Sequence, residues 1–198
     1  MSALHDTGGV AFELDGQPIT ARPGETILKA AQRHGVEIPH LCYTDGLRPD
    51  GNCRACVVEI AGERTLAPSC CRAPTEGMKV QATSPRARKS QEMVVEMLLS
   101  DMPDTGYRWN DGGIKTPELI AASAYPSSAS GQFDSKNPET IGQHGELSEW
   151  ADRLGVTVRP ALQALRREQP APDLSHPAMA VNLDACIQCT RCVRACRE

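Results

Sequence analysis

The sequence has few aromatic residues, little net charge and no long apolar run. Phe, Trp and Tyr make up 4% of its 198 residues, which is too little for one large hydrophobic core. We therefore expect two small domains, each stabilised by a bound cofactor. The formal net charge of −4 gives no indication of nucleic-acid binding. No apolar run is long enough to cross a membrane, so we expect no membrane partner.

The N-terminal residues also lack the features of a secretory signal. Residues 1–9 have no basic start and no apolar stretch. The nine cysteines are an odd number, which argues against a disulfide framework. Thiols that stay available for metal indicate a reducing, cytoplasmic environment. No cysteine lies between Cys71 and Cys186, so the thiols form two separate groups.

The first group of thiols lies on and after a loop that is rich in turn-forming residues. Ten, two and thirteen residues separate its four candidate ligands, which are Cys42, Cys53, Cys56 and Cys70. The segment 57–60 is expected to be a strand and 64–67 its return strand, which would bring the last thiol back to the other three. Gly46 and Gly51 allow backbone N–H groups to approach an anionic centre. Four Cys thiolates are the ligand set of a [2Fe–2S] cluster, so we predict that these residues bind one.

Two other interpretations of these thiols are weaker. A zinc site usually combines two short C-x2-C pairs, whereas only Cys53 and Cys56 are that close here. Disulfides are disfavoured by the odd number of cysteines and the absence of a signal. Cys71 adjoins Cys70 and could replace it as the fourth ligand, but we expect Cys71 to be a small buried side chain. A zinc-binding structural or interaction protein is therefore the alternative of another class.

The second group has the spacing C-x2-C-x2-C-x3-C of bacterial ferredoxins. Its members are Cys186, Cys189, Cys192 and Cys196. In two-cluster ferredoxins the first three thiols of this motif bind one [4Fe–4S] cluster and the fourth binds the other. The sequence ends two residues after Cys196, so ligands of the other half would lie downstream. Because metal binding and folding are coupled, we expect residues 174–198 to be an incomplete and poorly ordered site.

The hydrophobic pattern predicts an α+β protein. Strands are expected at 10–14, 18–21, 57–60, 64–67, 78–80 and 178–182, and helices at 26–34, 85–101, 116–124, 146–154 and 161–167. Ser84 is the expected N-cap of the second helix, in which one stripe contains Met93, Val94, Met97, Leu98 and Asp101. The order of elements suits a β-grasp [2Fe–2S] ferredoxin-like domain, then an irregular linker, then the first half of a two-[4Fe–4S] ferredoxin domain. The expected units are a tail at 1–9, the [2Fe–2S] domain at 10–84, a connecting helix at 85–101, a linker with short helices at 102–173 and the incomplete ferredoxin-type domain at 174–198.

Three short segments resemble a known group of iron–sulfur proteins. They are Ile38–Tyr43, Gly51–Glu59 and Pro68–Cys70. They are similar to the N-terminal [2Fe–2S] domain of the large subunit of respiratory NADH:quinone oxidoreductase, of iron-only hydrogenases, and of the alpha subunit of soluble NAD-dependent formate dehydrogenases. The match implies that Cys70 is the fourth ligand of the first cluster.

One departure separates these relatives. In the respiratory subunits and hydrogenases, a His-and-three-Cys [4Fe–4S] site usually lies just after the helix that follows the [2Fe–2S] domain. The sequence has no cysteine between Cys71 and Cys186, so it cannot form that site. This departure favours the alpha subunit of formate dehydrogenase, which residues 173–196 also resemble most.

The resemblance implies electron transfer, with no catalytic residue in these 198 residues. Electrons from formate oxidation would pass through the clusters toward a flavin- and NAD-binding iron–sulfur subunit. A catalytic domain with a molybdenum or tungsten bis-pterin cofactor would follow residue 198. The alternative is a fragment of an NADH:quinone oxidoreductase large subunit or of an iron-only hydrogenase. Arg48, Arg54 and Arg72 are expected either near the first cluster, where cations favour its reduced state, or as ordinary surface charges.

Overall fold

The fold is described from a computed structural model of the chain. The structure describes residues 8–102, 146–165, 168, 173–177, 179–181, 183 and 186–197. The helix expected at 116–124 and most of the expected tail and linker lie outside the described residues. The boundaries expected for the units stay predictions.

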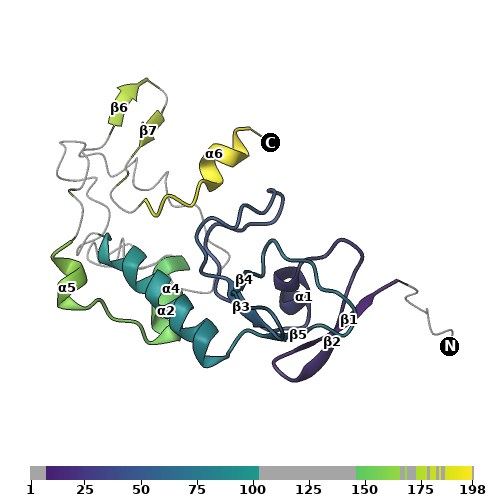
Figure 1. The fold of residues 1–198 in the computed structure, drawn as a ribbon. Coiled ribbons are helices and arrows are strands. Elements are labelled where there is room, and N and C mark those ends of the chain that lie inside the picture. Colours follow the sequence, from purple (N-terminus) through teal and green to yellow (C-terminus); the bar gives the residue numbers. More distant parts are fainter. Residues whose placement is uncertain are drawn as a thin grey trace.

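A mixed five-stranded sheet forms the centre of the N-terminal part (Figure 1). Its strands are β1 (Val10–Leu14), β2 (Gln17–Ala21), β3 (Val57–Ile60), β4 (Ala67–Pro68) and β5 (Lys79–Gln81). They lie in the order β2-β1-β5-β3-β4, in which β1 and β5 are parallel and the other neighbours are antiparallel. This arrangement agrees with the β-grasp order expected from the sequence. The return strand was expected at 64–67; the observed strand, β4, is shorter than expected and ends one residue later.

The β1–β2 hairpin follows from turn chemistry and alternation. Asp15 and Gly16 both have positive φ, 47° and 82°, as a tight two-residue hairpin turn requires. Phe12 and Leu14 are buried, whereas their neighbours along the strand are more exposed. The Asp15 carboxylate also accepts a hydrogen bond from the Ala82 N–H at 2.8 Å, so the turn is tied to the chain just after β5.

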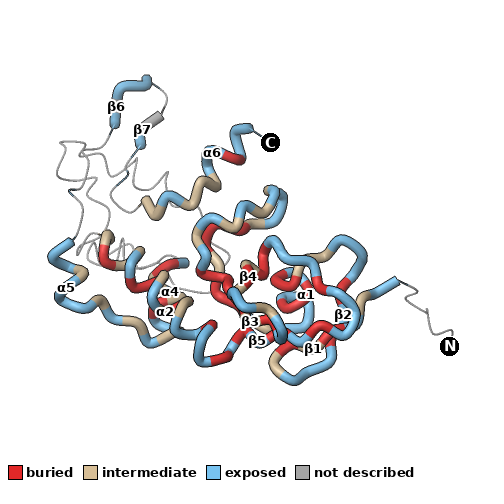
Figure 2. Tube along the Cα trace, viewed as in Figure 1, coloured by how far each residue is buried: buried red, intermediate tan, exposed pale blue. Residues whose placement is uncertain are grey.

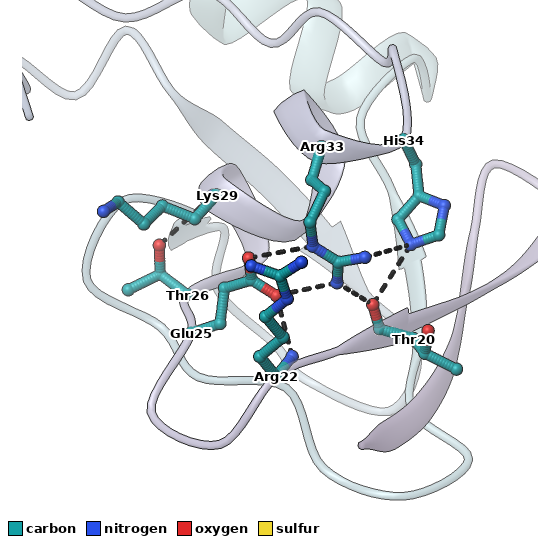
Figure 3. Close-up of polar contacts among 7 residues, drawn as sticks. All are labelled: Thr20, Arg22, Glu25, Thr26, Lys29, Arg33 and His34. Carbon is teal, nitrogen blue, oxygen red and sulfur yellow. Dashed lines mark hydrogen bonds and ion pairs between the residues drawn. The ribbon is translucent and has the colours of Figure 1, made fainter. Parts of the chain in front are cut away.

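Helix α1 (Ile27–Arg33) buries one face in the core of the sheet and is tied to β2 by polar contacts. Thr26 is its N-cap and accepts a hydrogen bond from the Lys29 N–H. The Arg33 guanidinium forms an ion pair with Glu25 at 2.8 Å and donates to the Thr20 carbonyl on β2 (Figure 3). These contacts fix the start of the loop that carries the first thiols.

Helix α2 (Pro85–Ser100) begins as predicted but buries a different face. Ser84 is the N-cap and accepts a hydrogen bond from the Ala87 N–H. The buried positions include Gln91 and Val95, whereas two members of the expected stripe, Met93 and Met97, are 46% and 59% exposed. The expectation was wrong for these methionines. The Gln91 amide donates to two buried carbonyls, and because this contact turns Gln91 toward the core, it sets the rotation of the helix.

A second layer of helices packs on α2. Helix α4 (Glu146–Leu154) has the predicted bounds, and α5 (Pro160–Gln163) is shorter than the helix expected at 161–167. Leu147 and Ala151 of α4 share a buried cluster with Val95 of α2 and with Leu41 and Ala55 of the loop before β3. Figure 2 shows buried segments in both the sheet and this helical layer. The first group of thiols therefore lies between two cores.

The C-terminal part contains a short hairpin and a last helix. The strands β6 (Asp173–His176) and β7 (Met179–Val181) pair antiparallel, and α6 (Arg191–Ala195) follows. The sequence predicted β7 but not β6. In Figure 1, α6 lies beside the loop that precedes β3. Among the described helices, none combines the length and apolar character needed to span a bilayer.

Candidate metal centre

The loop between α1 and β3 supplies three of the first four thiols, and a strand pair supplies the fourth. Cys56 immediately precedes β3 and Cys70 closely follows β4. Because Val57 is paired with Pro68 across these two strands, the two thiols are brought together at the same end of the strand pair. Ser69 strengthens this arrangement, because its hydroxyl donates to the Cys56 carbonyl at 2.7 Å.

The four sulfur atoms form a continuous series of contacts, in the order Cys53, Cys42, Cys70 and Cys56. The Cys42 N–H also donates to the Cys53 sulfur at 3.4 Å, and the Cys53 N–H donates to the Cys42 sulfur at 3.5 Å. Cys42, Cys56 and Cys70 are buried, and Cys53 is partly buried. The structure therefore brings together the four residues that the sequence predicted.

The contacts between these sulfurs favour alternating thiolate and thiol forms. Hydrogen bonds from Cys53 and then Cys70 lower the pKa of the Cys42 thiol far below its usual range. A hydrogen bond from Cys70 lowers the pKa of Cys56 to about 7. Cys53 and Cys70 act as the donors, so their pKa values are raised. The thiolate is the metal-binding form of cysteine, and two of the four side chains reach it readily.

The segment with Cys70 is also fixed to the N-terminus of α1. The Leu28 N–H donates to the Ser69 carbonyl at 3.0 Å, and the Ile27 N–H donates to the Arg72 carbonyl at 2.8 Å. These N–H groups belong to the first turn of the helix and have no partner within it. The N–H groups at the start of α1 and the carbonyls on either side of Cys70 thus satisfy each other's hydrogen bonds, and this holds Cys70 in position.

Cys71 differs from the sequence expectation. It is exposed, not buried, and its sulfur lies 3.5 Å from the Cys70 sulfur. The expectation failed because successive residues in this turn point in different directions, and Cys70 takes the buried position. Gly51 lies against Cys71: a Cβ atom there would be 3.0 Å from the Cys71 sulfur, and its φ of +63° also favours glycine.

The three arginines considered from the sequence have different surroundings. Arg72 forms an ion pair with Glu63 at 2.5 Å, so a carboxylate compensates its charge. Arg54 is exposed and has a φ of 60°, which shapes the turn between Cys53 and Cys56. Arg48 is also exposed, and its carbonyl accepts a hydrogen bond from Arg194.

The second group of thiols is more open. Cys186 and Cys189 are partly buried, and Cys192 and Cys196 are exposed. Gln188 and Thr190 have positive φ values of 54° and 62°, and these conformations bend the chain between the thiols. A positive φ is unusual for a β-branched residue such as Thr. In the part of the chain that the structure describes, no three His, Cys, Asp or Glu side chains surround a single ion position, and this holds for both groups of thiols. The first group differs in that its sulfur atoms contact one another in series.

The sequence did not reveal that the C-terminal segment contacts the first loop. Arg194 is buried and donates to the carbonyls of Cys42 and Arg48. Arg191 donates to the Tyr43 carbonyl at 2.8 Å. The only sequence signal is that two arginines three apart lie on one helix face, and this spacing alone names no partner.

Comparison with known proteins identifies the domain that holds the first site. Residues 8–85 match the family described as 2Fe-2S iron-sulfur cluster binding domain. This range contains all four thiols of the first group, so the first site lies in a segment that is similar to a [2Fe–2S] cluster-binding domain.

The longer comparisons point to large redox enzymes. The chain is 29% identical to a component of the NADH-quinone oxidoreductase of Rhizobium meliloti (strain 1021), over 96% of this chain and 19% of that protein. It is 31% identical to NADP-reducing hydrogenase subunit HndD of Solidesulfovibrio fructosivorans, over 94% of this chain and 27% of that protein. A crystal structure of an NAD+-reducing [NiFe]-hydrogenase in the H2-reduced state aligns with a TM-score of 0.64 and 26% identity, over 94% of this chain and 65% of that one. The chain thus spans about a fifth to a quarter of the length of these curated relatives.

Proposed function

We propose that this chain carries single electrons through a [2Fe–2S] cluster, as part of the iron–sulfur subunit of an NAD-linked oxidoreductase. The observation that carries the proposal is the contact series of Cys42, Cys53, Cys56 and Cys70 within the matched domain. Four thiolates are the ligand set that such a cluster needs, and the residues present fit it. When bound, the cluster supplies a one-electron redox centre.

The protein's own contribution is the environment of these sulfurs. Burial of Cys42, Cys56 and Cys70 excludes water from the ligands. The N–H groups of Cys42 and Cys53 donate to sulfur, and such hydrogen bonds raise the reduction potential of a cluster. Cys71 is exposed and lies beside Cys70, so one side of the site is near solvent.

The second motif is proposed to bind [4Fe–4S] clusters together with a downstream segment. Cys186, Cys189 and Cys192 would hold one cluster, and Cys196 would hold a second one by ferredoxin logic. The left-handed backbone at Thr190 supports this proposal, because strained conformations concentrate at ligand-binding turns.

For the whole enzyme, we propose the alpha subunit of a formate dehydrogenase. The support is the stretch without cysteine between Cys71 and Cys186. The proposal includes a downstream molybdenum or tungsten bis-pterin domain and a flavin subunit that reduces NAD. A subunit of a hydrogenase or NADH-quinone oxidoreductase is the second candidate, because the relatives named above carry those names. Reduction of the clusters by formate, tested with the downstream domain present, supports the first candidate, and reduction by hydrogen or NADH alone supports the second.

The central experiment is anaerobic reconstitution of the 198-residue chain with iron and sulfide. We expect visible absorption and a paramagnetic resonance signal of a reduced [2Fe–2S] cluster, with about two irons at this site. A Cys186→Ser, Cys189→Ser double variant serves as the control, because it removes the second motif and should keep this signal. A colourless product that carries only zinc would contradict the proposal.

A further inference from the structure

The C-terminal helix is joined to the first metal centre by one buried guanidinium. Arg194 is 8% exposed, although arginine is seldom buried without partners. Its Nη2 donates to the Cys42 carbonyl and its Nη1 donates to the Arg48 carbonyl at 2.5 Å. The two carbonyls belong to opposite parts of the same loop, so a single side chain holds them together.

Contacts from the residues that precede Arg194 repeat this connection. Arg191 donates to the Tyr43 carbonyl at 2.8 Å and forms an ion pair with Glu146 of α4 at 2.6 Å. The Asn52 amide donates to the Gln188 carbonyl at 3.3 Å, and the Thr190 hydroxyl contacts Asp50 at 3.4 Å. The chain around Cys189 and Cys192 is therefore attached to the loop that carries Cys42 and Cys53.

The contact with Cys42 acts directly on a ligand of the first site. A peptide unit is planar and trans, so a carbonyl held toward α6 aims the following N–H in the opposite direction. Arg194 thus fixes the peptide that follows Cys42, and Arg191 fixes the next one. A lysine could not replace Arg194 fully, because its single ammonium cannot reach two separated carbonyls in the fixed geometry of a guanidinium.

We infer that Arg194 is a positioning residue that couples the two cysteine motifs. It holds α6 against the loop of the first metal centre, so the order of each motif depends on the order of the other. The inference rests on the proposed function for its cluster part, whereas the contact itself exists in the chain without metal. Because coupling is reciprocal, a cluster at Cys42 must stabilise α6 by the same factor by which docked α6 stabilises that cluster.

The test measures amide exchange in the full 198-residue chain, with and without iron and sulfide. Arg194→Gln should raise exchange in residues 42–52 by about tenfold or more, the effect of losing a hydrogen bond from a charged group. The matched control is Arg197→Gln, which removes the same charge from the exposed end of the same segment and should leave this exchange unchanged. Equal exchange in the two variants would overturn the inference.

The coupling itself is measured in a Cys186→Ser, Cys189→Ser background, so that only the first site binds metal. Loading this site should slow exchange in residues 186–197, and Arg194→Gln should abolish that effect. If Arg194→Gln does not fold, the double-serine protein that keeps Arg194 still tests the coupling. Equal exchange of its residues 186–197 with and without the cluster would overturn the inference. If no cluster binds at all, the metal content contradicts the proposed function, while exchange of the metal-free chain still tests the Arg194 contact.

A third variant separates charge from geometry. Arg194→Lys keeps the positive charge but loses the two-carbonyl contact. We expect its [2Fe–2S] midpoint potential to stay close to that of the unchanged protein, while exchange in residues 42–52 rises. Arg194→Gln should lower the midpoint potential, because a nearby cation favours the more negative, reduced cluster. An unchanged potential in Arg194→Gln, together with unchanged exchange, would show that Arg194 has no positioning role.

Discussion

Gln91 connects the helical layer to the strand that follows the thiol loop, so its removal should loosen the first metal centre. Its side chain is fully buried, and its amide donates to the Val57 carbonyl at 2.9 Å and to the Ala82 carbonyl at 3.1 Å. Val57 directly follows Cys56, a predicted ligand. The variant Gln91→Met keeps the approximate size of the side chain and removes both donors.

The expected cost follows from the two carbonyls that lose their partner. Each buried acceptor left without this hydrogen bond costs about 1–3 kcal/mol. Part of this cost is returned, because the Oε1 atom of Gln91 is itself buried without a partner and disappears in the variant. At about 1.5 kcal/mol for each of the two acceptors the loss is about 3 kcal/mol, of which about 1 kcal/mol is recovered, so we expect Gln91→Met to reduce the free energy of unfolding by about 2 kcal/mol.

Urea unfolding of the metal-free, reduced chain measures this difference. With a slope of about 2 kcal/mol per molar urea, the midpoint should fall by about 1 M. Lys89→Met is the matched control, because it places the same side chain on the exposed face of the same helix and should change the midpoint little. The reconstituted Gln91→Met protein should also lose its visible absorbance to a chelator faster. A midpoint equal to that of Lys89→Met would refute the role assigned to Gln91.

Two further predictions follow from the site and the helical layer. Cys70→Ser should abolish or alter the [2Fe–2S] paramagnetic resonance signal, whereas Cys71→Ser should leave it nearly unchanged. The reason is that Cys70 is buried among the other predicted ligands, whereas Cys71 is exposed. The reverse pattern would assign the fourth ligand to Cys71. Hydrogen bonds from Arg159 hold the pKa of the Glu96 carboxyl below its ordinary value of 4.5. Because the folded-state pKa is lowered, this contribution to stability is present above pH 4.5 and is lost as the pH falls through the lowered value. Exchange in α5, corrected for the intrinsic pH effect, should therefore rise below pH 4.5, and Glu96→Gln should remove this dependence; a parallel rise in Glu96→Gln would exclude the ion pair as its cause.

Local structure was largely determined by the sequence, because its signals act over a few residues. The Asp15–Gly16 turn requires positive φ at both positions, and few residues other than Gly, Asn and Asp accept it. Ser84 and Thr26 cap their helices through hydrogen bonds to N–H groups three residues away. The bounds of α4 agree with the prediction, in which Gly155 and Pro160 separate this helix from the next.

The gathering of the first four thiols was also determined by the sequence. Their spacing predicted that Cys42, Cys53, Cys56 and Cys70 would converge, and the structure shows this convergence. The physical reason is the antiparallel pairing of β3 with β4, which brings Cys56, just before β3, close to Cys70, just after β4. Similarity to a known domain family supports the same conclusion.

Tertiary structure alone decided which surfaces meet. The expected stripe on α2 failed at Met93 and Met97, because the buried amide of Gln91 donates to the carbonyls of Val57 in β3 and of Ala82 just after β5. The contact of Arg194 with the first loop joins residues more than a hundred positions apart, and its partners are backbone carbonyls, which every residue carries. A partner without a side-chain identity leaves no pattern in a single sequence, so only the folded chain shows where the second motif meets the first.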